Sequence, residues 1–510
     1  MKKIFFLPFA FLILSAIIFS ACNQEPEEER IFSIEIEPDT KTMVHNQSLT
    51  FRPVVHTTGG ATRAVTWSVA GTTPVCPGGI GGCGGTSINV DTGLLAVCEN
   101  ETNTTLTITA KTIFDYPRYY ENTAVVTIVT AFAAPVNAAE LTAELNNILA
   151  HAQGGTPQDE YILFIGEDIE DFVNFTVPET FDKTISIRIL GTRENTITWK
   201  PVAQESRCVD DGRSLFIIQA ETGSVVTFIL DDIFIESSAA NVQSTSDLIS
   251  VRTGGKLEIR GETVLTNRFL GISHETGDTR SGNHAINIRG GEVILFNGSI
   301  IDNSRHGVRF SPDSEDGKFT MSGGLISRNA GHGVLLEGLN NTFTMTGGVI
   351  SHQETNNHTG VRFGAGRAAA RYNCACQHQV ALAPSVGTVF TMSGGTITNN
   401  DFGIRVVYDA PRFTLNGQFI MTGGTIRNSS RQEVQIHGAP GFLFDKSGPS
   451  IIEASNTSRI QIRNLGAGDI ADYRDLAGLG YDLRLQVDNT GNGSVPNSDN
   501  GTASNWRLIN

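Results

Sequence analysis

Five arginines occupy the same place in short apolar segments, and their guanidinium groups could bind a negatively charged ligand. Each follows a valine or an isoleucine, in the pairs Val251-Arg252, Ile288-Arg289, Val308-Arg309, Val361-Arg362 and Ile404-Arg405. If the segments are β-strands with the aliphatic residue inside, the arginines point outward and form one column. Solvent and neighbouring acids could offset the repulsion within such a column. Alternatively, the column could line a groove for an anionic polymer such as an acidic glycan, because guanidinium groups suit carboxylates and sulfates.

Two other clusters contain residue types that bind metals. The segment SPDSEDGK, residues 311–318, places Asp313, Glu315 and Asp316 close together, but without the spacing of a known calcium loop, so a solvated turn is the simpler interpretation. The segment CACQH, residues 374–378, could supply three zinc ligands. It has no second Cys or His pair, so a disulfide or free thiols are the simpler interpretation. We therefore expect neither a metal nor a cofactor.

His332 stands between two glycines, in a segment that recurs along the chain. The unit FTMSGGLISRN begins at Phe319, and close copies begin 24, 71 and 100 residues later. Each copy has methionine at its third position and isoleucine at its eighth. In the unit containing His332, the pair His332-Gly333 is equivalent to His306-Gly307, Thr359-Gly360 and Phe402-Gly403. We therefore interpret His332 as a turn residue of the repeat and assign no catalytic residue.

The repeat itself predicts a stack of short strands. Each unit contains strand patterns and no helical pattern, which favours a parallel β-helix over a propeller or a helical repeat. Phe and Met of each unit should point inward, so that Phe319 and its equivalents form an apolar column, and Gly323-Gly324 should make the bend. At the end of the second strand, the asparagines should adopt a left-handed turn and hydrogen-bond from coil to coil, as we expect for Asn267, Asn303 and Asn329.

This pattern resembles the right-handed parallel β-helix of the pectin-lyase-like superfamily, with about ten coils between residues 160 and 470. The resemblance implies a fold shared with sugar lyases and hydrolases. Polygalacturonases carry, in chain order, Asn-Thr-Asp, an acidic pair, Gly-His-Gly and Arg-Ile-Lys. Here only the Gly-His-Gly and the pairs Asp210-Asp211 and Asp231-Asp232 are found, and these pairs lie about 100 residues before His332. A polysaccharide lyase or glycoside hydrolase therefore remains the alternative function.

The first residues predict export and attachment to a membrane. Residues 1–21 place two lysines before an apolar run, as in a secretory signal peptide. The segment Phe19-Ser20-Ala21-Cys22 resembles the lipobox of bacterial lipoproteins, which implies acylation of Cys22 and a lipid anchor in the bacterial cell envelope, at the cell surface or in the periplasm. A secreted protein with a free Cys22 is the alternative. Residues 22–30 are acidic and predict a solvated tether.

The rest of the chain divides into four further segments. Residues 31–132 show short alternating strands around Trp67 and resemble a group 2 bacterial Ig-like domain, which implies a β-sandwich that serves as a spacer or binds a host ligand. Residues 137–155 predict a helix with Asn137 as its N-cap, and this helix should cap the end of the β-helix. The β-helix should span 156–487, followed by a polar tail over 488–510.

Composition limits the partners. The net charge is −16, and −18 once the two lysines of residues 1–21 are removed, which argues against a nucleic-acid partner. Six cysteines remain after Cys22, and their pairing is left open: Cys76, Cys83, Cys98, Cys208, Cys374 and Cys376. The leading hypothesis is a monomeric, lipid-anchored envelope protein whose β-helix presents a long face for binding or adhesion, with a polysaccharide or host-surface ligand. A structural stalk is a third possibility.

Overall fold

The chain divides into two compact units, residues 1–131 and 132–510. The computed structural model describes residues 30–508 except 59, 74–84, 114–117, 156, 202–213, 239–246, 268–283, 354–357, 365–385, 408–416, 438–442, 447–449, 454–458, 464–469, 473–482 and 488–505. Among the described residues, no helix has the length and hydropathy needed to cross a membrane.

The first unit is a β-sandwich. Its buried side chains form one cluster between three sheets, with Trp67 only 5% exposed. Trp67 packs against Phe51 with ring centroids 6.2 Å apart. Gly93 has a φ of 71°, and a Cβ there would lie 2.8 Å from the Trp67 ring, so this turn needs glycine. The first sheet contains β1 (Arg30–Glu37) and β4 (Arg52–Thr58). The second contains, in order, β2 (Thr40–Val44), β9 (Glu121–Val129), β8 (Thr105–Thr112) and β5 (Val65–Ala70). The third contains β3 (Ser48–Thr50), β7 (Leu94–Ala96) and β6 (Ser87–Ile88).

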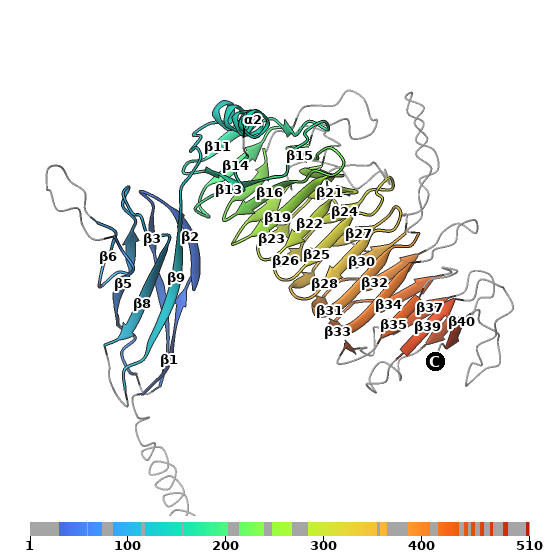
Figure 1. Ribbon diagram of the computed structural model, residues 1–510. Coiled ribbons are helices and arrows are strands. Elements are labelled where there is room, and N and C mark those ends of the chain that lie inside the picture. Colours follow the sequence, from blue (N-terminus) through green and yellow to red (C-terminus); the bar gives the residue numbers. More distant parts are fainter. Residues whose placement is uncertain are drawn as a thin grey trace, which may run out of the picture. The chain divides into compact units, whose positions relative to one another are not determined.

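The second unit begins with the predicted helix, α2 (Ala138–Gly154), which lies at the first end of the solenoid (Figure 1). The Asn137 side chain accepts a hydrogen bond from the Glu140 backbone N–H at 2.9 Å, and the Glu140 carboxylate accepts one from the Val136 N–H at 3.2 Å. This is similar to a capping box, except that the glutamate accepts from the residue before the N-cap and not from the N-cap itself. Four apolar side chains of the helix are buried in the same core as the first coils, namely Leu141, Leu145, Ile148 and Leu149. The helix therefore covers an apolar end that would otherwise face water.

The remainder is a right-handed parallel β-helix, whose described strands form ten coils of three strands each (Figure 1). The first strands are β10 (Glu160–Phe164), β13 (Ile185–Leu190), β16 (Val226–Asp231), β19 (Gly255–Arg260), β22 (Glu292–Leu295), β25 (Lys318–Met321), β28 (Thr342–Met345), β31 (Val389–Thr398), β33 (Gln418–Arg427) and β35 (Leu443–Lys446). The second strands pair in the same 20-stranded sheet: β11 (Ile169–Phe172), β14 (Thr196–Trp199), β17 (Phe234–Ser237), β20 (Val264–Thr266), β23 (Ser299–Ile301), β26 (Leu325–Ser327), β29 (Val349–Ser351), the later parts of β31 and β33, and β36 (Ile451–Glu453).

The third strand of each coil belongs to a separate 11-stranded sheet. Strands of neighbouring coils run parallel, and the register is regular from β18 to β34 and shifts between β34 and β37. They are β12 (Phe175–Thr176), β15 (Phe216–Ile218), β18 (Ile249–Arg252), β21 (Ile286–Arg289), β24 (Val308–Phe310), β27 (Val334–Leu336), β30 (Thr359–Phe363), β32 (Phe402–Val407), β34 (Gln432–His437) and β37 (Arg459–Arg463), joined at the end by β38 (Ile470–Asp472).

The aromatic column expected from the repeat is present. Phe319 stacks on Phe343 with centroids 4.9 Å apart, Phe343 on Phe390 at 4.5 Å and Phe390 on Phe419 at 5.0 Å, and Phe444 extends the column at 5.3 Å. The planes differ by at most 11°, and the described rings are fully buried or nearly so. Because every one of these coils contributes one ring at the same place, each ring packs against the rings above and below it.

The Gly-Gly pair makes the bend between the first two strands, as predicted. Gly324 has a φ of 75°, a conformation that favours glycine. Gly323 is required for a different reason, because a Cβ there would lie 2.2 Å from the Phe296 carbonyl oxygen of the preceding coil. One glycine therefore allows the left-handed backbone and the other allows the coils to approach closely.

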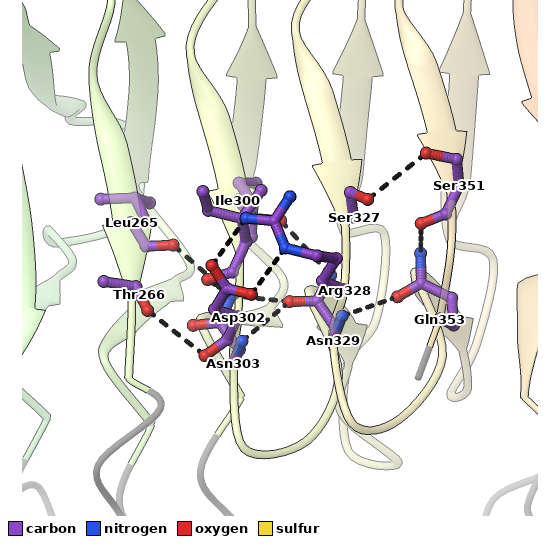
Figure 2. A network of polar contacts seen from close by, with 11 residues as sticks. Leu265, Thr266, Ile300, Asp302, Asn303, Ser327, Arg328, Asn329, Ser351 and Gln353 are labelled. Carbon is purple, nitrogen blue, oxygen red and sulfur yellow. Dashed lines mark hydrogen bonds and ion pairs between the residues drawn. The ribbon is translucent and has the colours of Figure 1, made fainter. Parts of the chain in front are cut away.

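For the asparagine turn, the predicted hydrogen bonds between coils are confirmed, but the predicted backbone conformation is wrong (Figure 2). Asn303 donates from Nδ2 to Asn329 Oδ1 at 2.7 Å, so these side chains do join adjacent coils. The left-handed residue, however, is the one before the asparagine: Asp302 has a φ of 55° and Arg328 a φ of 52°. The buried asparagine side chain must turn inward to reach backbone and side-chain partners, so the residue before it takes the positive φ.

The last coil is closed by antiparallel pairing. β38 pairs with β37, β39 (Leu483–Val487) pairs with β35, and β40 (Trp506–Leu508) pairs with β39. The predicted polar tail thus ends in a strand, while residues 488–505 lie outside the described residues.

Candidate functional site

The five arginines lie on the outer face of the 11-stranded sheet, but they form two rows and not the single predicted column. Arg252 pairs in register with Arg289, and we call these two the short row. Arg309 pairs with Asn287, two residues earlier on β21 than Arg289, and so starts a different row. That row continues through Leu335 to Arg362 and Arg405, and we call Arg309, Arg362 and Arg405 the long row.

Acids of neighbouring turns approach the short row. Arg252 lies 3.7 Å from the Glu179 carboxylate and also donates to Gln219 at 3.4 Å. Arg289 lies 3.7 Å from the carboxylate of Asp313, which belongs to the acidic loop 311–318. The two carboxylates are more than half exposed, so solvent screens both ion pairs.

The long row makes closer contacts. Arg309 donates from Nε to the Glu337 carboxylate at 2.8 Å, and the Glu337 side chain is only 4% exposed. Arg405 donates to Gln435 at 2.7 Å and lies 4.4 Å from the centre of the Phe402 ring. Arg362 has its Nη1 2.9 Å from His332 Nε2. These contacts hold three guanidinium groups against one strip of the sheet.

A ladder of histidines borders the long row. His284, His306 and His332 occupy successive coils, and their rings stack in parallel with centroids 4.8 and 4.9 Å apart. The backbone N–H of His332 donates to His306 Nδ1 at 2.7 Å, and that of Thr359 donates to His332 Nδ1 at 3.1 Å. The second and third rings thus accept a hydrogen bond from the backbone of the next coil. A Cβ on Gly331 would lie 2.2 Å from His306 Nδ1, so the glycine before His332 makes room for this ladder.

The electrostatics of the ladder favour neutral imidazoles. Burial lowers the pKa of all three ring systems well below the usual value, and nearby guanidinium groups act in the same direction. For His284 the guanidinium is that of Arg309, and for His332 that of Arg362. These histidines are therefore structural hydrogen-bonding groups that stay neutral at neutral pH, which agrees with the interpretation of His332 as part of the repeat.

Sequence reasoning missed His284 and the closeness of the ladder to the arginines. His284, His306 and His332 each stand two residues before a buried aliphatic residue of the third strand, namely Ile286, Val308 and Val334. This spacing was the signal that could have identified the row.

The other sequence candidates do not come together with the arginines. Asp231 and Asp232 lie at the end of β16 in the 20-stranded sheet, where Asp231 is 3.8 Å from Arg188 and Asp232 accepts a hydrogen bond from the Glu262 N–H at 2.9 Å. In the described part of the chain, no three His, Cys, Asp or Glu side chains are grouped to hold a metal ion. Cys98 is a free thiol. Cys22, Asp210, Asp211 and the segment 374–378 lie outside the described residues, as do Cys76, Cys83 and Cys208.

Comparison with known proteins identifies no family for this chain. No family model matches the chain, and no curated protein matches it. Among solved structures, the chain is similar to the periplasmic alginate epimerase AlgG, with 12% sequence identity, a TM-score of 0.26, and coverage of 68% of this chain and 84% of that one. A point mutant of the same enzyme matches with 12% identity, a TM-score of 0.22, and coverage of 68% and 85%. At these TM-scores, the activity of the epimerase does not transfer to this chain.

Proposed function

We propose that this protein is a lipid-anchored protein of the bacterial cell envelope whose β-helix binds an anionic glycan along its arginine face. In this proposal, acylated Cys22 attaches the chain to the membrane, the acidic segment 22–30 acts as a tether, and the β-sandwich is an Ig-like spacer. The single observation that supports glycan binding is the long row, because Arg309, Arg362 and Arg405 lie along one strip of a continuous parallel sheet.

The chemistry of the strip favours a carboxylate or sulfate ligand over a neutral one. Guanidinium groups bind such anions through paired, charge-assisted hydrogen bonds. The rigid sheet fixes the arginine backbones, so little conformational entropy is lost when an extended polymer binds. The net charge of the chain is −16, so attraction of a polyanion has to come from local groups of cations such as this strip.

The test compares two triple variants that remove the same charge. The first, the arginine-face variant, changes Arg362 and Arg405 of the long row and Arg289 of the short row to Gln. The second changes three exposed cations elsewhere on the solenoid to Gln, namely Arg193, Lys200 and Arg328. Calorimetric titration with polygalacturonate, and with a carboxyl-reduced form of the same polymer, measures binding.

We expect the arginine-face variant to lose at least about tenfold in affinity, because each charge-assisted hydrogen bond contributes about 1.5–3 kcal/mol. The matched variant should keep its affinity, and the reduced polymer should not bind. Equal losses in both variants, or equal binding of the two polymers, would refute the proposal.

A further inference from the structure

The end of the sandwich at which β1 begins exposes large apolar side chains. Phe32 and Ile113 are each 55% exposed, and Tyr119 is 51% exposed. Phe32 lies at the bulge of β1, where the register with β4 shifts. Ile113 follows the last residue of β8, and Tyr119 stands two residues before β9. Exposed apolar side chains that gather at one place beside polar ones mark an interaction site.

Backbone contacts place these residues at the same end of the sandwich. Arg30, the first residue of β1, pairs with Thr58 at the end of β4. The chain between β4 and β5 then reaches Ala64, whose carbonyl oxygen accepts a hydrogen bond from the Ile113 N–H at 3.1 Å. Because β8 and β9 pair as neighbours, Tyr119 lies at the same end as Ile113. The start of β1 and the β8–β9 end therefore lie together (Figure 1).

This end of the sandwich is cationic, although the net charge of the chain is −16. We call its described residues the tip, namely residues 30–32, 60–64, 111–113 and 118–121. The charged residues of the tip are four cations and one acid, namely Arg30, Arg63, Lys111, Arg118 and Glu121. Lys111 Nζ lies 4.5 Å from the centre of the Tyr119 ring, and the guanidinium carbon of Arg118 lies 5.3 Å from that of Tyr120. Aromatic rings beside cations favour the boundary between lipid and water.

The chain before the sandwich indicates which surface the tip meets. In the proposed function Cys22 is acylated, and Arg30 follows it by eight residues. Eight fully extended residues span at most about 29 Å. The acyl chains thus hold the tip within that distance of the bilayer, and so high a local concentration favours even a weak contact. A bilayer surface offers phosphates to the cations and an apolar layer to the rings.

We propose that the tip docks on the membrane to which the chain is anchored. Phe32, Ile113 and Tyr119 enter the headgroup layer, and Lys111 and Arg118 contact lipid phosphates. The inference rests on the lipid anchor of the proposed function and does not involve glycan binding. It assigns a lipid contact to the sandwich, in place of free movement on the tether.

Two tryptophan reporters in the acylated chain test the docking. Tyr119→Trp places an indole ring on the tip, and Val125→Trp places one at an exposed position of β9, about 14 Å from the start of that strand. Vesicles of phosphatidylcholine and phosphatidylglycerol with brominated acyl chains quench an indole only at close range. Relative to vesicles without bromine, the tip reporter should be quenched and the β9 reporter should keep its emission. The native Trp67, Trp199 and Trp506 contribute equally to both chains.

Paired substitutions in the Tyr119→Trp chain then test the apolar contact. Phe32→Ser together with Ile113→Ser should lower the ratio of docked to free tips at least about tenfold, because two apolar side chains no longer leave water on docking. The matched pair, Val90→Ser together with Leu94→Ser, removes exposed apolar groups of the sandwich outside the tip and should leave the quenching unchanged. Circular dichroism melts confirm that each variant is folded.

Mass spectrometry of Cys22 separates the docking from the anchor. With Cys22 acylated, quenching of the tip reporter alone, and its loss only in the Phe32 and Ile113 pair, supports the docking. With Cys22 acylated, equal quenching of the two reporters, equal losses in the two serine pairs, or a tip that forms dimers in ultracentrifugation without being quenched overturns the docking and leaves the anchor standing.

A chain that carries no acyl group on Cys22 contradicts the proposed anchor but still tests the tip. The same vesicles are then added to the unacylated chain. Quenching of the tip reporter alone supports the docking, and its absence overturns it.

Discussion

The sandwich and the solenoid bury titratable groups whose responses to acid differ in pH range. In the solenoid, His284, His306 and His332 are buried as neutral rings, and burial lowers the pKa of each. In the sandwich, burial alone would raise the pKa of Glu101, but hydrogen bonds from Thr73 and Asn103 outweigh it and lower the pKa to about 2. The solenoid therefore depends on buried histidines that must remain neutral. The sandwich depends on a carboxylate that remains ionised well below the ordinary pKa of a glutamate.

The two units also distribute their packing differently. Trp67 meets Phe51 and Gly93 in contacts that occur once in the sandwich. In the solenoid the phenylalanine column repeats one contact from coil to coil, so each ring supports two neighbours. A repeated contact spreads a local defect to adjacent coils, whereas a single contact confines it.

The largest expected effect is acid destabilisation of the solenoid alone. Because the unfolded histidines bind protons below their ordinary pKa of 6.5 and the folded ones do not, the stabilisation is complete above pH 6.5 and falls as the pH decreases below it. Each histidine contributes a slope of about 1.4 kcal/mol per pH unit, and the three together about 4 kcal/mol. The cationic neighbours Arg305, Arg309 and Arg362 strengthen the effect.

Pulsed hydrogen exchange in urea, with the labelling pulse always at one pH and peptides identified by mass spectrometry, measures both units in one sample. At pH 5.0 the urea midpoint of the solenoid should decrease relative to pH 7.5, while that of the sandwich changes little. Parallel decreases in the two units would contradict the comparison.

A smaller effect is expected from Phe343→Ala. Removing a buried ring between two stacked neighbours should lower the free energy of unfolding of the solenoid by about 4 kcal/mol, through lost burial and the cavity. Faster exchange should extend to peptides containing Phe319 and Phe390. Trp67→Ala is the matched substitution in the sandwich, and its effect should remain within that unit. Exchange confined to β28 in Phe343→Ala would mean that the coils are energetically independent.

The smallest of the three effects is expected from Glu101→Gln. A pKa of about 2 against an ordinary 4.5 means that the ionised carboxylate contributes about 3 kcal/mol above pH 4.5, and this contribution is lost as the pH falls toward 2. The variant should lose about 2 kcal/mol of sandwich stability at pH 7, since the amide oxygen still accepts hydrogen bonds. Pulsed hydrogen exchange in urea, followed on sandwich peptides, should show that the sandwich of Glu101→Gln no longer weakens between pH 4.5 and 2. If the sandwich of Glu101→Gln still loses stability between pH 4.5 and 2, other carboxylates cause that loss.

The repeat predicted the solenoid because residues of the same type recur at fixed positions, and these positions define the register between coils. Phenylalanine, methionine and isoleucine recur at fixed places, and the structure pairs Phe319 with Phe343 and Met321 with Met345 as expected. The prediction of a single arginine column was wrong for a physical reason. A strand has a period of two, so a shift of two residues keeps every side chain on its face, and alternation cannot distinguish Arg289 from Asn287 as the neighbour of Arg309.

Contacts between coils were harder to predict than faces. Glu337 lies just beyond β27, and its pairing with Arg309 depends on the path of the turn that follows the strand. The left-handed turn residue was misplaced by one position because propensity favours asparagine, while the fold needs that asparagine for buried hydrogen bonds. Tertiary demand for a polar side chain overrode local preference.

The antiparallel strands at the last coil bear on self-association. A parallel stack that ended abruptly would offer a row of free backbone N–H and C=O groups, which is a template for another chain to add to. β38, β39 and β40 reverse direction and occupy part of that edge, while α2 lies over the other end. The same backbone pairing that builds the coils would otherwise build fibrils, so the reversed strands set where growth of the stack stops.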